Sequence, residues 1–142
     1  MVRIALYQPD IPQNVGAAMR LCACMGLALD IIDPCGFPWD EKKIARAGMD
    51  YIHLVHTTHH SSWNNFKQQT TGSRLILMTT KTDCSYLDFT FKDNDILIAG
   101  RESAGVPEHI HEELIHHITI PMAKEARSMN VINALSMVVG ES

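Results

Sequence analysis

The chain has 142 residues, of which 46% are hydrophobic and 20% charged, a balance that predicts one globular domain spanning 1–142 and excludes a disordered chain. Its formal net charge of −4 argues against a protein that coats nucleic acid non-specifically, although a local basic patch is compatible with it. No apolar run has the length of a membrane span and the N-terminus lacks a signal-peptide pattern, so we expect a cytoplasmic protein.

Short apolar runs alternate with helical patterns along the whole chain. In the first half they predict a strand at 3–7, a helix from Pro12 to Gly26, a strand at 29–32, a loop at 33–36 and a helix at 39–47 ended by Gly48. A weakly marked strand at 53–55 and a helix at 59–69 stopped by Gly72 follow. The second half predicts strands at 74–79 and 95–99, a helix at 107–115, a strand at 117–120 and a terminal helix. This alternation predicts an α/β fold with a mostly parallel sheet covered by helices on both faces.

The two longest helical patterns carry apolar faces and candidate caps. We expect Asp10 or Asn14 to cap the first helix, and Ser128 or Asn130 to cap the terminal one. The predicted inward faces are Val15, Ala18, Met19, Cys22 and Met25 in the first helix, and Val131, Leu135, Val138 and Val139 in the last.

The stretch 14–20 contains the first candidate for chemistry. Helical side chains lean toward the N-terminus, so Arg20 would extend over Gly16 toward the helix start near Asn14, where anions are favoured. This arrangement suits a phosphate or a developing alkoxide. Taken alone, the pattern favours a simpler interpretation, in which Gly16 lets the helix pack closely and Arg20 pairs with a surface carboxylate.

Two further polar stretches, 100–107 and 120–131, adjoin predicted strands. In the first, Gly100 permits close backbone approach and Glu102 adds an acceptor, but neither the dinucleotide pattern G-x-G-x-x-G nor the nucleophile elbow G-x-S-x-G is present. In the second, Ser128 and Asn130 lie beside Arg127 at a helix start, which suits either capping or a polar ligand. Arg101, Lys124 and Arg127 favour a functional basic group, whereas Lys42, Lys43 and Arg46 fit a solvated face as well as a phosphate track.

Neither the cysteines nor the histidines predict a metal site. Cys22 and Cys24 have no second pair, and His111 and His116 are five positions apart, which does not place two ligands on one helical face. The other histidines of the middle region are expected at the surface: His53, His56, His59 and His60. We therefore expect no zinc and no other metal.

Three spaced motifs, taken together, resemble those of the SPOUT RNA methyltransferases, SpoU branch. They are N-x-G-x-x-x-R at 14–20, G-x-E-x-x-G-x-P at 100–107, and I-P-M at 120–122 followed by S-M-N at 128–130. The stretches 6–14, 33–40, 46–51 and 79–81 resemble the TrmL (YibK) subgroup of that branch.

The resemblance implies a SPOUT fold with a deep C-terminal trefoil knot, S-adenosylmethionine as cofactor and S-adenosylhomocysteine as product. It implies a homodimeric enzyme that methylates the ribose 2′-hydroxyl of the wobble nucleotide, position 34, a cytidine or uridine derivative, in leucine tRNAs. The implied catalytic residues are Arg20, Asn14, Glu102 and Asn130. The implied cofactor-binding residues are Met78, Thr79, Gly100, Glu102, Gly105, Ile120, Met122, Ser128 and Met129.

Two other functions are compatible with parts of this pattern. The same chemistry could act on another tRNA position or on ribosomal RNA, and the subgroup signatures and the lack of an appended RNA-binding domain argue against that. A non-catalytic RNA-binding module is disfavoured because a relative without activity should have lost part of the set Asn14, Arg20, Glu102, Ser128 and Asn130.

Overall fold

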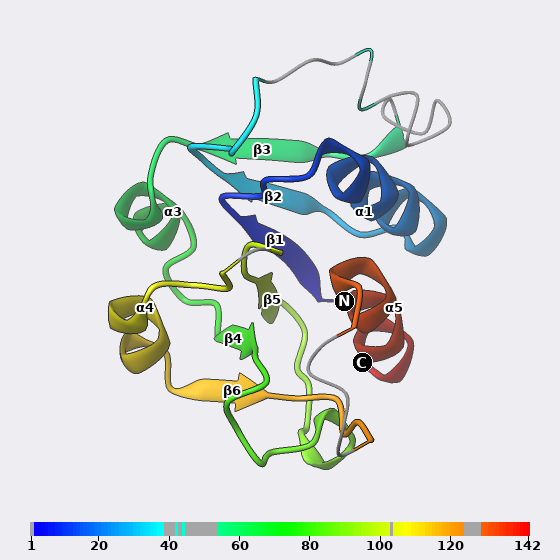
Figure 1. Cartoon of the computed structure of the whole chain (residues 1–142), viewed down its shortest axis with the longest axis vertical. Helices are drawn as coiled ribbons and strands as arrows, with labels where there is room; N and C mark the ends of the chain where they lie inside the picture. Colours follow the sequence, from blue (N-terminus) through cyan, green and yellow to red (C-terminus); the bar gives the residue numbers. More distant parts are fainter. Residues whose placement is uncertain (1, 39–41, 43, 45–53, 103, 124–128) are drawn as a thin grey trace.

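Six parallel strands form one sheet in the order β3-β2-β1-β5-β4-β6, as Figure 1 shows. The computed structural model describes residues 2–38, 42, 44, 54–102, 104–123 and 129–142. The strands are β1 (Arg3–Tyr7), β2 (Leu29–Ile32), β3 (Thr57–His60), β4 (Leu75–Met78), β5 (Ile96–Ala99) and β6 (His116–Ile118). The helices are α1 (Pro12–Met25), α3 (Trp63–Gln69), the 3₁₀ helix η2 (Tyr86–Asp88), α4 (Glu108–Glu113) and α5 (Val131–Glu141).

Both faces of the sheet are covered by helices. Because alternate residues of each central strand point to opposite sides, each strand contributes to a separate core on each face. Ile4 and Leu6 of β1 belong to a core shared with α1 and α5. Ala5 and Tyr7 belong to a second core shared with α3 and α4. Figure 1 shows the two helix pairs on opposite sides of the strands. The predicted α/β fold with a parallel sheet is therefore confirmed.

Helix α1 starts at Pro12 without a side-chain cap, so the predicted cap by Asp10 or Asn14 is wrong. Ile11 occupies the cap position in an extended conformation. Asn14 lies inside the first turn, and its side chain bonds to Glu102 in a distant loop instead. Gly26 ends the helix with φ +69°, as expected for a residue that adopts the left-handed conformation readily. The predicted inward face is confirmed except at Met25, which is 40% exposed because the helix ends there, beside solvent.

The third strand lies at 57–60, and Leu54 and Val55 are not part of a strand, which corrects both the predicted strand and the helix predicted to start at residue 59. Strand β3 is an edge strand paired with β2 alone, so its polar sequence T-T-H-H carries little apolar pattern. Helix α3 begins at Trp63, with Ser62 as its cap accepting from the amide of Asn65.

His60 is buried, which corrects its predicted surface position. Its Nε2 lies 2.8 Å from Oδ1 of Asp30 on the neighbouring strand, and the same carboxylate oxygen accepts from Arg3 at 2.7 Å. His56 and His59 are exposed as expected, and His53 lies outside the described residues.

The remaining β-strands and α-helices agree with the predicted ones to within about two residues, whereas the short 3₁₀ helix η2 has no counterpart among the predicted elements. Asn130 caps α5 by accepting from the amides of Ile132 and Asn133, which confirms one of the two candidate caps. Nearly all of the predicted helix at 39–47, with Gly48, lies outside the described residues. So does segment 124–128, through which the predicted knot would pass, and the knot therefore stays a prediction. None of the described helices is long and apolar enough to cross a membrane.

Candidate functional site

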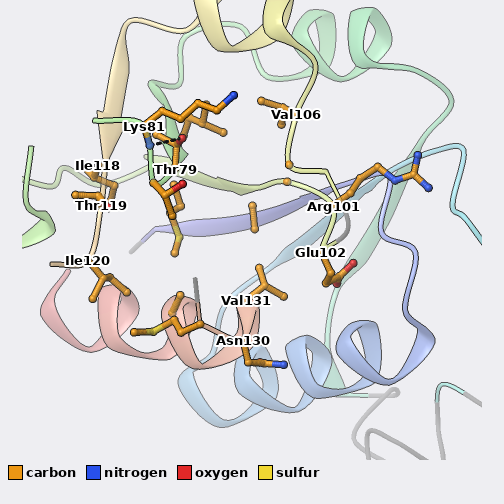
Figure 2. A pocket seen from close by; sticks show the side chains of 18 of the residues that line it. Thr79, Lys81, Arg101, Glu102, Val106, Ile118, Thr119, Ile120, Asn130 and Val131 are labelled. Carbon is orange, nitrogen blue, oxygen red and sulfur yellow. Dashed lines mark hydrogen bonds between the residues drawn. The ribbon is translucent and has the colours of Figure 1, made fainter. Parts of the chain in front are cut away.

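A pocket of about 600 Å³ opens at the carboxyl ends of β4, β5 and β6. In a parallel sheet these ends meet at one edge, where the loops that follow the strands can converge on a ligand. Here the loops at 78–81, 99–106 and 118–122 line the pocket together with Ile11 and Asn14 of the α1 start and with the first turns of α5 (Figure 2). All three sequence motifs therefore contribute to one cavity.

A chain of side-chain hydrogen bonds joins the three motifs. Asn14 donates from Nδ2 to Oε1 of Glu102 over 2.9 Å. Asn130 donates from Nδ2 to Oδ1 of Asn14 over 3.4 Å. Asn130 is itself held by the amides at the start of α5, so its orientation is fixed by the cap. This order places both asparagine side chains and one carboxylate at the same end of the pocket.

The loop after β5 is a tight turn that depends on two glycines. Arg101 and Gly105 exchange backbone hydrogen bonds of 3.1 and 2.8 Å, and Gly105 has φ +67°. A Cβ on Gly100 would lie 2.6 Å from the carbonyl carbon of Gly105 and 2.9 Å from the nitrogen of Val106. Any larger residue at position 100 would therefore force this loop, and the pocket wall with it, to move.

The carboxyl group of Glu102 is half-buried and has a raised pKa. Burial is the largest cause, and a hydrogen bond with the carboxyl of Asp10 raises the pKa further. Bonds from Asn14 and from the Asp10 amide act in the opposite direction. Asp10 also faces Arg101, whose Nε lies 3.8 Å from Oδ2 of Asp10. The carboxyl groups of Glu102 and Asp10 and the guanidinium of Arg101 are thus grouped at the end of the pocket that carries the two asparagines.

The opposite end of the pocket carries Thr79, Lys81 and His111. Oγ1 of Thr79 accepts from the amide of Lys81 at 3.1 Å and lies 3.3 Å from Nε2 of His111. The His111 ring packs edge-on against that of His117, with 4.3 Å between centroids. Figure 2 shows Thr79 and Lys81 well apart from Glu102 and Asn130, so the two polar ends are separate.

Most of the predicted site residues line this pocket. They are Asn14, Met78, Thr79, Gly100, Glu102, Gly105, Ile120, Met122, Met129 and Asn130. Arg20 does not line it and lies on the exposed side of α1. Ser128, and with it Lys124 and Arg127 of the basic group, lies outside the described residues, whereas Arg101 of that group is a lining residue.

Lys81 and His111 line the pocket but were not among the predicted site residues. Lys81 follows a clearly marked strand by a few residues, so the rule that ligands bind beyond strand ends would have included it. His111 lies on the first turn after Pro107, and nothing in the sequence indicates that this turn faces the cavity.

The described residues contain no group of three or more histidine, cysteine or acidic side chains that could hold a metal ion. All four cysteines are free thiols. The polar side chains that line the pocket carry amide, hydroxyl, carboxyl, imidazole and cationic groups.

The three motifs that resemble those of the SpoU-branch RNA methyltransferases line one pocket at the strand ends, which is the arrangement expected for that class of enzyme. The comparison with known sequences agrees. The profile of the SpoU rRNA Methylase family matches residues 1–140, and the chain belongs to this family.

Individual relatives are similar over nearly the full length. A tRNA (cytidine(34)-2′-O)-methyltransferase of Beijerinckia indica is 50% identical over 141 residues, which cover 98% of this chain and 88% of that protein. A solved structure reported to give insight into 2-OH methylation of C/U34 on tRNA superimposes with a TM-score of 0.95 at 34% identity, covering 99% of this chain and 93% of the other. An AdoMet-bound rRNA methyltransferase from Sinorhizobium meliloti shares the fold, with a TM-score of 0.87 at 22% identity and coverage of 99% and 54%.

Proposed function

We propose that this chain transfers a methyl group from S-adenosylmethionine to the ribose 2′-hydroxyl of the wobble nucleotide, position 34, of tRNA, with leucine tRNAs as the substrates. In this proposal residues 1–142 form one methyltransferase domain, which acts as a homodimer in the cytoplasm. The observation that carries the proposal is the hydrogen-bonded chain Glu102–Asn14–Asn130, because it joins all three motifs at the wall of one pocket.

The pocket fits the size and chemistry of the methyl donor. Its volume of about 600 Å³ is within the range of roughly 300–1,000 Å³ found for small-molecule and cofactor sites. Apolar side chains such as Leu77, Ile118 and Val138 suit an adenine ring, and the carboxyl group of Glu102 suits a positively charged sulfonium. The absence of a side chain at Gly100 leaves the turn compact enough for backbone groups to reach a ligand.

The residues that would hold the donor come from each strand-end loop. We assign Met78 and Thr79 after β4, Gly100, Glu102 and Gly105 after β5, and Ile120, Met122, Ser128 and Met129 in the segment leading to α5. When bound, the donor supplies an electrophilic methyl carbon on a positively charged sulfur, and no metal is needed because that sulfur becomes neutral as it leaves.

The protein would contribute mainly alignment of the attacking oxygen with the methyl carbon. Such alignment can supply up to about 7–11 kcal/mol of the barrier. Asn14 and Asn130 would orient the reacting groups, and their mutual bond limits the side-chain freedom lost on binding. Arg20 is assigned to a substrate phosphate or to the developing alkoxide, since a guanidinium is almost always protonated and makes a poor base.

The decisive experiment is nucleoside analysis of tRNA from a deletion strain and from the same strain carrying the gene. The proposal predicts that 2′-O-methylated derivatives of cytidine or uridine at position 34 disappear from leucine tRNAs and return on complementation. Loss of methylation at another tRNA position, or in ribosomal RNA, would replace this substrate with one of the alternatives. Unchanged RNA in both strains would favour a binding module without catalysis.

The role of Arg20 is tested with the purified protein. Arg20→Ala should abolish turnover while calorimetric binding of S-adenosylhomocysteine stays close to that of the wild type, because Arg20 does not line the pocket. Near-normal methylation by this variant would contradict the assignment.

A further inference from the structure

Glu102 is the acidic side chain that lines the pocket among the residues that the structure describes. One carboxylate oxygen, Oε1, accepts from Asn14 over 2.9 Å, and the other, Oε2, lies 3.4 Å from the backbone nitrogen of Asp10. A carboxylate oxygen has room for more than one hydrogen bond, so Glu102 is held in position and still able to accept a proton.

Asp10 gives that proton a second interaction. Its backbone nitrogen lies 3.4 Å from Oε2 of Glu102, which brings the two residues together, and the interaction of its carboxyl group with that of Glu102 favours the protonated form of Glu102. A carboxylic acid beside a carboxylate donates its O–H to the neighbour, whereas two carboxylates side by side repel each other. The contact therefore stabilises the proton that Glu102 would take up.

The loop after β5 brings a cation next to the pair. Arg101 faces Asp10 from the same loop as Glu102, with 3.8 Å between Nε and Oδ2. From α1 the facing group is the Asn14 amide, which is neutral, and from the start of α5 it is Asn130, also neutral. The described part of the loop after β6, residues 119–123, has no titratable side chain facing the pair. Arg101 therefore places its positive charge beside Asp10, within 3.8 Å of its carboxylate.

We propose that Glu102 accepts the proton of the attacking ribose 2′-hydroxyl and that Asp10 is a positioning residue that receives the hydrogen bond of the protonated Glu102. This proposal rests on the proposed methyl transfer. His111, the other lining side chain able to take a proton, lies beside Thr79 at the far end of the pocket, away from Asn14 and Asn130.

The step balances without a further reactant. The oxygen–hydrogen bond of the ribose breaks and its proton passes to Glu102, while the oxygen forms a bond to the methyl carbon supplied by the donor. The pair of electrons from the broken carbon–sulfur bond stays on sulfur, which becomes neutral. Glu102 then releases the proton to solvent through Asp10, whose side chain is 16% exposed.

Three variants test the proposal: Glu102→Gln, Asp10→Asn and, as a matched control, Glu112→Gln on the exposed side of α4. Glu102→Gln keeps an oxygen that can accept from Asn14 but cannot take a proton. We expect it to lower the single-turnover rate by about 100-fold or more. The circular dichroism spectrum should stay close to that of the wild type, and the rates are compared at saturating donor and RNA because Glu102 is also assigned to hold the donor. Glu112→Gln should change none of these quantities.

The second readout does not depend on turnover. The carboxyl pKa of Glu102 is measured by ¹³C NMR titration of the protein without donor or RNA. Asp10→Asn should lower this pKa, because an amide can donate to the carboxylate and stabilise its ionised form. Since a base works only when deprotonated, the rate falls as pH drops through its pKa, and Asp10→Asn should move this acidic limb to lower pH by the same interval as the NMR pKa.

The outcomes separate this proposal from the proposed function. A Glu102→Gln rate within about threefold of wild type, or an acidic limb that stays in place while the NMR pKa moves, overturns the role of Glu102. If Glu102→Gln does not fold, the pH profiles of wild type and Asp10→Asn still decide. If the wild type methylates no RNA, the proposed function fails, and the titration alone then tests the carboxyl pair: an ordinary pKa for Glu102 would overturn it.

Discussion

Replacing Gly100 by alanine tests whether the turn after β5 sets the geometry of the pocket. The added Cβ would lie 2.6 and 2.7 Å from the carbonyl carbon and Cα of Gly105 and 2.9 Å from the nitrogen of Val106, all of them backbone atoms. Ordinary contacts begin near 3.4 Å, so the backbone at Gly105 must retreat. The required shift is roughly 0.8 Å, and a misplacement on the order of 1 Å can cost about 100-fold in rate.

The same substitution should lower stability. Inserting a methyl group against rigid backbone typically costs about 1–3 kcal/mol, which corresponds to a fall in melting temperature of roughly 4–12 °C for a chain of this size. Differential scanning calorimetry measures the stability. Titration calorimetry with S-adenosylhomocysteine and single-turnover methylation measure the site, and both affinity and rate should fall.

Gly140→Ala is the matched control for this prediction. A Cβ there meets nothing within 4 Å, and Gly140 lies in α5, where alanine is favoured over glycine by up to about 1 kcal/mol. The control should therefore keep wild-type affinity and match or exceed the wild-type melting temperature. A Gly100→Ala protein with unchanged affinity, rate and melting temperature would refute the reasoning.

Three further predictions concern stability and thiol reactivity. Asp30→Ala leaves His60 and Arg3 without their buried partner and should lower the free energy of unfolding, measured in urea, by about 3–5 kcal/mol. The control Asp33→Ala, which removes a surface contact with His59, should lower it by less than about 1 kcal/mol. Equal losses in the two variants would contradict this prediction. Burial acts to raise the pKa of Asp95, but hydrogen bonds from Arg74 and from the Lys92 amide outweigh burial and hold this pKa below its ordinary 3.8. The ionised carboxylate therefore stabilises the fold above about pH 4, and this stabilisation is lost as the pH falls through the lowered pKa. The urea midpoint should drop over that pH range, and the drop should be smaller in Arg74→Gln. Burial, and then the neighbouring Asp33, raise the pKa of the Cys35 thiol to about 12. At pH 8, iodoacetamide should therefore modify the exposed Cys24 and Cys84 well before Cys35, which mass spectrometry can follow. Early modification of Cys35 would be inconsistent with its burial.

The buried strands and the site loops could be predicted from sequence because their signals are local. Strands such as 29–32 and 96–99 are short apolar runs bounded by polar or glycine residues. The loops of the pocket contain the glycines and prolines that such turns need, and the resemblance to a known family is what links these separate loops to one site.

The failures arise where long-range contacts override local pattern. Strand β3 carries no apolar alternation because it pairs on one side only, and His60 is buried because β3 places it beside Asp30 of β2. Asn14 looks like a helix cap, yet its amide is used by a carboxylate 88 positions further along the chain. The contact between Asp10 and Glu102 has no sequence signal at all, since neither residue type nor spacing indicates it.

The bond between Asn14 and Asn130 spans 116 positions of a 142-residue chain. A growing polypeptide therefore lacks one wall of its pocket until Asn130 has been translated, however early the first strands assemble. Contacts so remote along the chain are slow to form. Since a ligand stabilises only the state that binds it, the proposed methyl donor would favour chains that include Asn130 over shorter ones.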